Sequence, residues 1–285
     1  MAFLARFRHP ALNVIHEGAY WRTLEQGQAL ALVRVSPAGT ADAPILSVDL
    51  AAQDGEIDEQ KLLAILSHIL GTDEDRTAFY AMARSDERLW AVVEPVYGLP
   101  DLRSSSVFEA LMQTIIEQHI AWVSAQRAQR WLVEWAGRGI RYEGQEFYAF
   151  PSPEQIAGAR LDELKPLKIT HGRIALMTSI AGGVVTGELD LEAINSLPLG
   201  DAYERLLEIK GVGHWTAAVT LSRALGREDY IPYNDVGLQA AVKHYFFNQR
   251  GRATAKMVKD TFASYGAFAG KAAACTLVRW VLDRY

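Results

Sequence analysis

The stretch from Tyr203 to Asp235 reads YERLLEIKGVGHWTAAVTLSRALGREDYIPYND, and it decides most of what the sequence predicts about the fold. Apolar residues at helical spacing precede a short glycine turn, Ile209–Gly213, and recur directly after it. The pattern therefore predicts two helices joined by a tight hairpin. A loop with Gly226 and Pro232 follows, and it ends at a single carboxylate, Asp235.

The predicted hairpin has the properties of an anion site. Gly211 and Gly213 carry no side chains, so a phosphate can approach the backbone closely and a positive φ costs little. The second helix begins near Gly213, where its unpaired N–H groups and the positive end of its dipole face outward. Lys210 adds a charge. The same pattern also fits an ordinary connection between helices, in which the glycines serve only geometry.

The flanking residues favour the first interpretation, because the segment resembles the helix-hairpin-helix DNA glycosylase superfamily. That superfamily joins a hydrophobic-x-Gly-Val-Gly-x-Trp-Thr-Ala hairpin to an essential Asp about twenty residues later. The chain matches over Ile209–Ala217 and at Asp235, with Lys210 where proline is usual. Further stretches are similar to the alkylated-base branch, typified by bacterial 3-methyladenine DNA glycosylase II. These stretches are ILGTDEDRTAFYAMARSDERL, FEALMQTIIEQHIAWVSAQ with Glu117 where glycine is usual, FPSPEQIA and LKITHGRIALM.

Periodicity predicts an α+β fold that is mainly helical. WRTLEQGQALALVRVSPAG and APILSVDLAA alternate as strands do, so a small antiparallel β-sheet lobe is expected within residues 1–72. A helix is expected over 58–70. Residues 73–285 are expected to form the helical glycosylase region, two subdomains with a cleft between them. The other expected boundaries are loops over Gly137–Phe150 and Gly182–Gly187, and a helix start after Pro198, Gly200 and Asp201.

Composition limits the function classes. Of 285 residues 49% are hydrophobic, which indicates a globular chain, and no apolar run is long enough for a membrane span. The one cysteine, Cys275, excludes an internal disulfide and a four-cysteine iron–sulfur cluster. No side-chain metal site or cofactor is expected. The N-terminus does not have the pattern of a signal peptide, and a monomer in a prokaryotic cytoplasm, associated with the nucleoid, is expected.

Net charge argues against a nucleic-acid partner, since −5 has the wrong sign for binding a polyanion. The distribution along the chain is more favourable. Residues 201–285 hold twelve Lys and Arg against eight Asp and Glu, a balance of +4, which leaves −9 for the first 200. Contact with double-stranded DNA is therefore expected on the C-terminal side, helped by the hairpin amides.

Asp235 is the candidate catalytic residue. Cleavage of an N-glycosidic bond develops positive charge on the deoxyribose, and a nearby carboxylate stabilises that charge and can orient or deprotonate water. A helix is expected to begin here, with Asn234 as its cap, and its dipole favours an anion in the first turn. The simpler interpretation is that Asp235 is only a capping acid; the hairpin at the family's spacing favours catalysis.

Trp215 predicts the reaction type. In lyase branches of the superfamily a lysine at this position attacks the sugar and forms a Schiff base. Trp215 has no amine, so the resemblance implies a monofunctional glycosylase that leaves an abasic site. A cationic alkylated purine should stack on electron-rich rings. The predicted base pocket is Trp215, Phe268 (where tryptophan is usual), Tyr233 and Trp122, although each ring also fits a core position.

The remaining site residues follow from the resemblance. A flipped base leaves a gap in the duplex, and the wedge position falls on Gln118 and His119. The predicted DNA-binding residues are Lys210, Gly211, Val212, Gly213, His214 and Thr216. A monovalent cation held by backbone carbonyls would lie at Leu207, Ile209 and Val212. Two alternatives stay open: a non-catalytic DNA-binding module, and a glycosylase for another lesion, such as hypoxanthine or an oxidised purine.

Overall fold

The computed structural model describes residues 12–40 and 45–284. The chain divides into two compact units, and each is assembled from two separate segments. The first unit comprises residues up to Leu66 together with Leu111–Leu191, and the second comprises Ser67–Ala110 and Glu192–Tyr285. Segments of the two units therefore alternate along the sequence. The predicted domain boundary near residue 72 stays a prediction.

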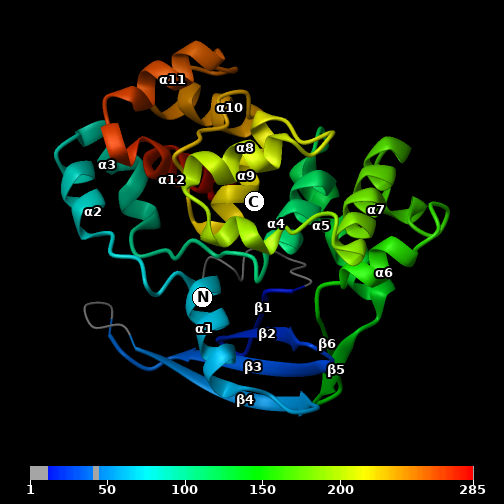
Figure 1. Ribbon diagram of the computed structural model, residues 1–285. Helices are drawn as coiled ribbons and strands as arrows, with labels where there is room; N and C mark the ends of the chain where they lie inside the picture. Colours follow the sequence, from blue (N-terminus) through cyan, green and yellow to red (C-terminus); the bar gives the residue numbers. More distant parts are fainter. Residues whose placement is uncertain (1–11, 41–44, 285) are drawn as a thin grey trace. The chain divides into compact units, whose positions relative to one another are not determined.

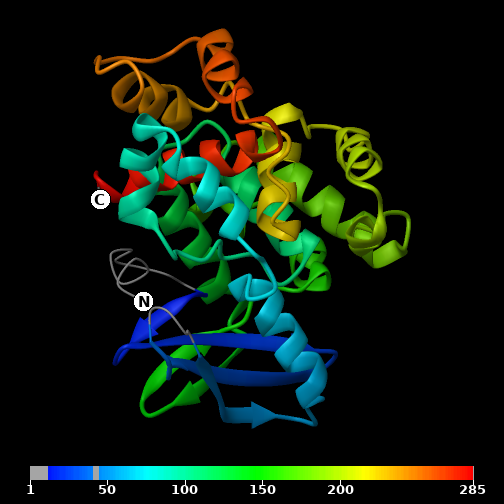
Figure 2. The ribbon, with the colours of Figure 1, turned by 90° about the vertical axis from the view of Figure 1, so that its left-hand side faces the viewer.

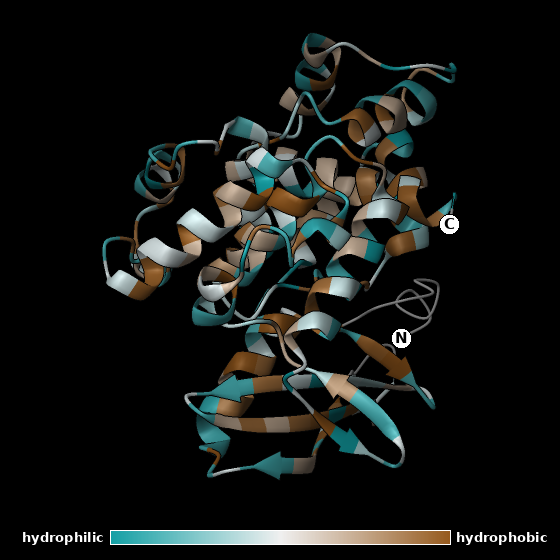
Figure 3. Cartoon of the chain, turned by 90° about the vertical axis from the view of Figure 1, so that its right-hand side faces the viewer, coloured by the Kyte–Doolittle hydropathy of each residue, from teal (hydrophilic) through white to brown (hydrophobic). Residues whose placement is uncertain are grey.

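The first unit is built on a four-stranded antiparallel sheet in the order β1-β2-β3-β4 (Figure 1). Its strands are β1 (Val14–His16), β2 (Ala19–Gln26), β3 (Ala29–Pro37) and β4 (Leu46–Asp54). Glu17 and Gly18 both have positive φ in the two-residue turn between β1 and β2, as a type I′ hairpin requires. In Figure 3 the strands carry brown, apolar residues next to teal, polar ones. Burial does not alternate along the central strands as predicted, because Ala19–Leu24 of β2 and Ala29–Val33 of β3 are buried without a break.

A second hairpin, β5 (Gly139–Tyr142) and β6 (Gln145–Tyr148), packs on this sheet. The prediction of a loop over 137–150 is therefore wrong. Glu143 and Gly144 form another turn with both φ positive, and the short strands pair around it. Phe147 stacks on Trp21 with ring centroids 5.3 Å apart, so tertiary packing stabilises strands that are too short to be evident from periodicity.

Helices complete the first unit. They are α1 (Glu59–Leu70), α4 (Val107–Glu117), α5 (Trp122–Ala136), α6 (Pro153–Gly158), η3 (Lys165–Leu167) and α7 (His171–Thr186); the unit boundaries fall within α1 and α4. The loop predicted over 182–187 is wrong, because α7 continues through Gly182 and Gly183 and ends against Gly187, whose φ is 76°. A left-handed glycine is a common helix C-terminus. The predicted helix over 58–70 is present.

The described residues of the second unit form helices and the loops between them, and no strand. Its elements are α2 (Thr77–Arg84), α3 (Glu87–Val93), η2 (Glu94–Val96), η4 (Glu192–Ser196), α8 (Leu199–Leu207), α9 (His214–Leu225), α10 (Val236–Tyr245), α11 (Ala255–Ala263), η5 (Gly266–Phe268) and α12 (Ala269–Leu282). α8 begins at Leu199, so Gly200 and Asp201 lie in its first turn instead of preceding it. An acid in the first turn suits the helix dipole.

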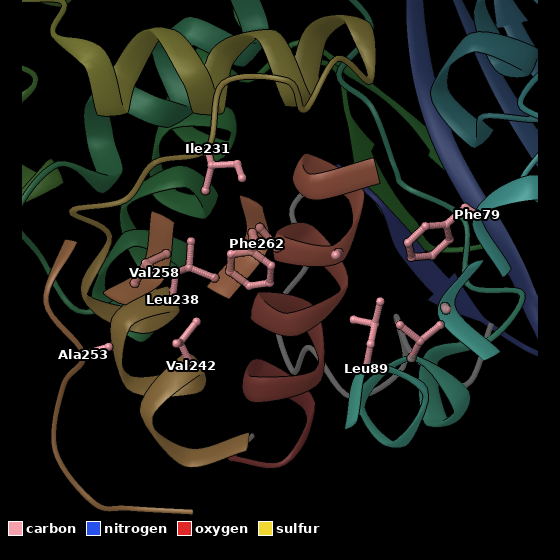
Figure 4. Close-up of a cluster of buried hydrophobic side chains, with 12 residues drawn as sticks. Phe79, Leu89, Ile231, Leu238, Val242, Ala253, Val258 and Phe262 are labelled. Atoms are coloured by element: carbon pink, nitrogen blue, oxygen red, sulfur yellow. The ribbon is translucent and has the colours of Figure 1, made fainter. Parts of the chain in front are cut away.

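One hydrophobic cluster joins the two segments of this unit. α12 packs against α3, α10 and α11, which lie beside it in both views (Figures 1 and 2). The cluster collects buried side chains from α2 and α3 and from the C-terminal helices (Figure 4). Phe262, Leu89 and Val242 are almost fully buried within it. The predicted mainly helical α+β fold, with an N-terminal sheet and a helical hairpin, is confirmed.

Candidate functional site

The α8–α9 hairpin has a buried centre and an exposed backbone on either side. The Ile209 N–H donates to the Leu206 carbonyl at 3.2 Å, and the Val212 N–H donates to the Ile209 carbonyl at 2.9 Å. Val212 is buried, whereas Gly211 and Gly213 on either side are exposed. The apolar side chain therefore anchors a turn whose glycine backbone faces solvent.

The two hairpin glycines serve different purposes. Gly211 has a φ of 93°, in the left-handed region that other residues rarely adopt. Gly213 has a φ of −106° and a ψ of −177°, an extended conformation open to any residue. A Cβ added at Gly213 would meet nothing within 4 Å. Gly211 therefore shapes the turn, and Gly213 leaves open space in front of the backbone.

α9 begins directly after that open space. Gly213 is its N-cap and supplies no side-chain oxygen to the first-turn amides. Those amides and the helix dipole form an anion-binding position at the start of a 12-residue helix. Lys210 is exposed beside it. The side chain of Thr216 is buried, so a contact of this residue with phosphate would use its backbone.

Asp235 is held by two N–H donors from different elements. The Trp215 indole Nε1–H donates to Asp235 Oδ2 at 2.8 Å, and the Leu238 N–H donates to Asp235 Oδ1 at 2.7 Å. The second bond makes Asp235 the N-cap of α10. The prediction of Asn234 as the cap is therefore wrong; Asn234 is exposed and one residue too early. The capping role and the candidate catalytic role fall on one carboxylate.

The aromatic pocket residues divide between the two units. Trp215 is hydrogen-bonded to Asp235. Tyr233, two residues before Asp235, stacks its ring on His214 at a centroid distance of 6.2 Å. Tyr233 and Phe268 are half-buried and pack against the same hydrophobic cluster, where Phe268 meets Phe79 at 6.0 Å. Trp122 belongs to the first unit, at the beginning of α5.

The predicted wedge residues lie in the first unit, in the connection between α4 and α5. His119 is exposed and has a φ of 55°, which is uncommon for a residue other than glycine. The carbonyls of Ile116 and Gln118 accept hydrogen bonds from Arg173 Nη1, so the connection is fixed from α7. Strained, fixed and exposed residues are typical of functional positions.

A buried ionic cluster supports the loop that leads to Asp235. Lys271 Nζ contacts Glu74 at 2.8 Å, Asp101 at 2.5 Å and Glu228 at 2.9 Å. Burial alone would lower the pKa of the Lys271 ammonium, but the carboxylates of Glu228 and Asp101 raise it above its ordinary value. Burial raises the pKa of the Glu228 carboxyl to about 7, an effect that Asp101 increases and Lys271 opposes.

Two close contacts at glycines fix the same loop. A Cβ at Gly270 would lie 1.9 Å from the Glu228 carbonyl oxygen, so only glycine admits this approach of the loop to α12. A Cβ at Gly226, whose φ is 66°, would collide with the Arg103 guanidinium. Sequence analysis missed this support, because Glu74, Asp101, Glu228 and Lys271 are far apart along the chain and none belongs to a motif.

No group of three or more His, Cys, Asp and Glu that could hold a metal occurs among the residues that the structure describes. The predicted monovalent cation at the carbonyls of Leu207, Ile209 and Val212 stays a prediction. Cys275 packs against the hydrophobic cluster, and burial raises the pKa of its thiol to about 12, as expected of a core residue. No helix within the described ranges is long and apolar enough to cross a membrane.

The helical hairpin, its exposed glycines and the carboxylate that follows lie as the resemblance to the helix-hairpin-helix DNA glycosylase superfamily predicts. Relatives and solved structures of that superfamily are similar to this chain and support the resemblance. No protein-family model matches the chain. Among curated proteins it is similar to a DNA-3-methyladenine glycosylase of Bacillus subtilis, with 26% identity over 243 residues, 85% of this chain and 80% of that protein.

Solved structures of DNA glycosylases are also similar to this chain. A 3-methyladenine DNA-glycosylase from Archaeoglobus fulgidus matches with a TM-score of 0.83 and 27% identity, covering 100% of this chain and 93% of its own. An 8-oxoguanine glycosylase/lyase of Clostridium acetobutylicum, in complex with double-stranded DNA, matches with a TM-score of 0.75 over 96% of this chain and 88% of its own. Its 20% identity shows the shared fold alone.

Proposed function

We propose that the protein is a monofunctional DNA glycosylase of base excision repair, which hydrolyses the N-glycosidic bond of flipped-out alkylated purines of the 3-methyladenine type. The bond from Trp215 Nε1 to Asp235 Oδ2, at 2.8 Å, carries the proposal. It joins the residue after the phosphate-binding hairpin to the one carboxylate at the family's position. The relatives named for 3-methyladenine, at 26% and 27% identity, support this substrate class.

Asp235 acts on the sugar. As the bond to the base breaks, positive charge develops on the deoxyribose, and the ionised carboxylate stabilises it electrostatically. The same oxygen atoms orient or deprotonate the attacking water. An alkylated purine is already cationic and departs as a neutral base, so this mechanism needs no second acid. The two N–H donors hold the carboxylate in one orientation, which limits its reorganisation during the reaction.

The hairpin supplies affinity without reading sequence. The amides at the start of α9 and the charge of Lys210 bind a phosphate of the duplex, and the open space at Gly213 admits it. Gln118 and His119 fill the gap that the flipped base leaves. Trp215, Tyr233 and Phe268 provide aromatic surface for an electron-poor base. The protein works as a monomer on prokaryotic chromosomal DNA and requires no cofactor.

The absence of lyase activity belongs to the proposal. Trp215 stands where lyase branches carry the reactive lysine. Lys271 does not substitute for it, because its ammonium lies among three carboxylates and is held in the charged form, which is not a nucleophile. We therefore expect intact, abasic strands as the product.

Release of free base from a panel of duplexes tests the proposal. Each duplex carries one modified base: an N-alkylated purine, hypoxanthine or 8-oxoguanine. We expect the alkylated purine to be released fastest, with no strand cleavage and no adduct trapped by borohydride. Binding without release of any base would favour a DNA-binding module, and preferred release of 8-oxoguanine or hypoxanthine would favour a glycosylase for that lesion.

A further inference from the structure

The first two residues of α9 bond to the two ends of one turn. His214 Nε2 lies 2.9 Å from the Ile231 carbonyl oxygen, and Trp215 Nε1 lies 2.8 Å from Asp235 Oδ2. Ile231 begins the turn and Asp235 ends it. Because His214 and Trp215 are adjacent at the rigid start of a helix, they fix both ends of the turn relative to the hairpin.

The turn itself is bonded closely around Ile231. The Tyr233 N–H donates to the Ile231 carbonyl at 2.9 Å, and the Asp235 N–H donates to the Pro232 carbonyl at 2.8 Å. Ile231 is buried, and its side chain points from the loop toward the hydrophobic cluster (Figure 4). The Ile231 carbonyl therefore accepts two hydrogen bonds, one from the turn and one from His214, and this peptide group determines where the turn starts.

The surroundings of His214 select one tautomer of its neutral ring. A carbonyl oxygen only accepts, so Nε2 carries the hydrogen and Nδ1 accepts from the Tyr203 hydroxyl at 2.8 Å. The Tyr203 ring stacks on Tyr230 with centroids 3.8 Å apart and an interplanar angle of 8°. Tyr230 precedes Ile231 directly, so α8 supports the same end of the turn through Tyr203. Both ring nitrogens of His214 are thus used within the protein.

We propose that His214 is a positioning residue, which holds the Ile231–Asp235 turn against the hairpin and so places the Asp235 carboxylate under the sugar of a flipped nucleotide. This inference rests on the proposed glycosylase function. It adds a role for the loop-facing ring of His214 that differs from phosphate binding by the hairpin backbone. Its consequence is that the group that binds DNA and the group that reacts move as one body.

Kinetic measurements separate positioning from binding. His214→Ala removes both ring contacts, and a displacement of about 1 Å at a catalytic group can cost about 100-fold in rate. For His214→Ala we expect the single-turnover rate of alkylated-base release to fall by about tenfold or more. Its affinity for DNA should stay within about threefold of the parent protein's affinity. His214→Gln keeps a donor that reaches the Ile231 carbonyl and should recover most of the rate. Tyr203→Phe removes only the second contact and should lose less.

A spectroscopic measurement needs no activity. The indole N–H of Trp215, assigned by its loss in Trp215→Phe, reports the bond to Asp235. We expect His214→Ala to shift this resonance and speed its exchange with solvent, and His214→Gln to restore both. The other tryptophan indole signals serve as internal controls. If the unmodified protein releases no base, the proposed function fails, and this spectrum still decides whether His214 positions Asp235.

Each outcome decides the inference. A slow His214→Ala enzyme with normal affinity, rescue by glutamine and a displaced Trp215 signal supports it. Unchanged base release together with an unchanged Trp215 signal overturns it. Equal losses of rate, affinity and melting temperature without rescue by glutamine would show a merely structural role, and also overturn it. If His214→Ala does not fold, Tyr203→Phe takes its place, because it removes one of the two ring contacts. Faster solvent exchange of the Trp215 indole N–H in Tyr203→Phe then supports the inference, and exchange at the parent rate overturns it.

Discussion

The two connections that flank α9 differ in how firmly the protein holds them. In the hairpin before α9 only the short turn around buried Val212 separates two glycines, Gly211 and Gly213, that are exposed to solvent. The loop after α9 is fixed at Gly226, at Glu228, at Tyr230 and at Ile231, each by a different partner. A uniform phosphate backbone needs only exposed amides, whereas bond cleavage needs an immobile carboxylate. In the proposed function, the connection before α9 binds the DNA backbone and the loop after α9 holds the reacting carboxylate.

Loss of the buried cation should have the largest effect on stability. Lys271→Met removes the cation that pairs with Glu228, whereas Glu74 and Asp101 keep their ion pairs with Arg76. Breaking a buried pair from one side typically costs about 3–5 kcal/mol. We expect the free energy of unfolding in urea to fall by an amount of that order. Lys256→Met, whose partner Asp260 and own side chain are exposed, is the matched control and should change little. Equal stability of the two variants would contradict a structural role for the cluster.

Glu228 should make stability depend on pH. Its folded pKa of about 7 lies above that of an unfolded Glu, so the folded state binds the extra proton between these values. Stability from this group is present at low pH and is lost as pH rises through 7. Relative to Glu228→Gln, the parent should lose on the order of 2 kcal/mol between about pH 5 and pH 8. Asp229→Asn, the exposed neighbour, should show no such difference, and the opposite slope would contradict the assignment.

Trp215→Phe sharpens the comparison at the catalytic end. The variant keeps an aromatic ring but removes the N–H that orients Asp235 Oδ2. We expect base release to slow about tenfold, which corresponds to about 1.4 kcal/mol of transition-state stabilisation. DNA affinity should be retained, because the hairpin backbone is unchanged. Trp131→Phe, in the first unit, is the control for a general effect of losing an indole. An unaltered rate of base release in Trp215→Phe would contradict the proposal that the Trp215 N–H orients Asp235.

The hairpin glycines should give the smallest effects, and they should differ. Gly213→Ala adds a methyl group where nothing lies within 4 Å, so folding should be unaffected. That methyl group faces the phosphate, and affinity should fall about threefold for damaged and undamaged duplexes alike. Gly211→Ala should also lower stability by about 1 kcal/mol, since its φ is 93°. Titration of both duplexes at several salt concentrations checks this, and unchanged binding by Gly213→Ala would leave the hairpin a structural turn.

The parts that could be predicted from the sequence are those with local causes. The hairpin, the helices around it and Asp235 lie within one continuous segment whose spacing is informative. The β5–β6 strands were missed because Phe147 gains its stability from Trp21, over a hundred residues away. Gly182 and Gly183 suggested a break, but packing keeps them helical. The Lys271 cluster could not be predicted, since its charged residues look like ordinary surface residues until the fold brings them together.

Asp235→Asn is the most direct test, because it changes the chemistry and keeps the cap. Asparagine is as good an N-cap as aspartate, so its carbonyl can still accept from the Leu238 N–H while the negative charge is lost. The measurement is single-turnover release of an alkylated purine from duplex DNA, with affinity for the same duplex as reference. The account predicts a rate lower by about 100-fold or more at unchanged affinity. Release by Asp235→Asn within about twofold of the parent rate would contradict it.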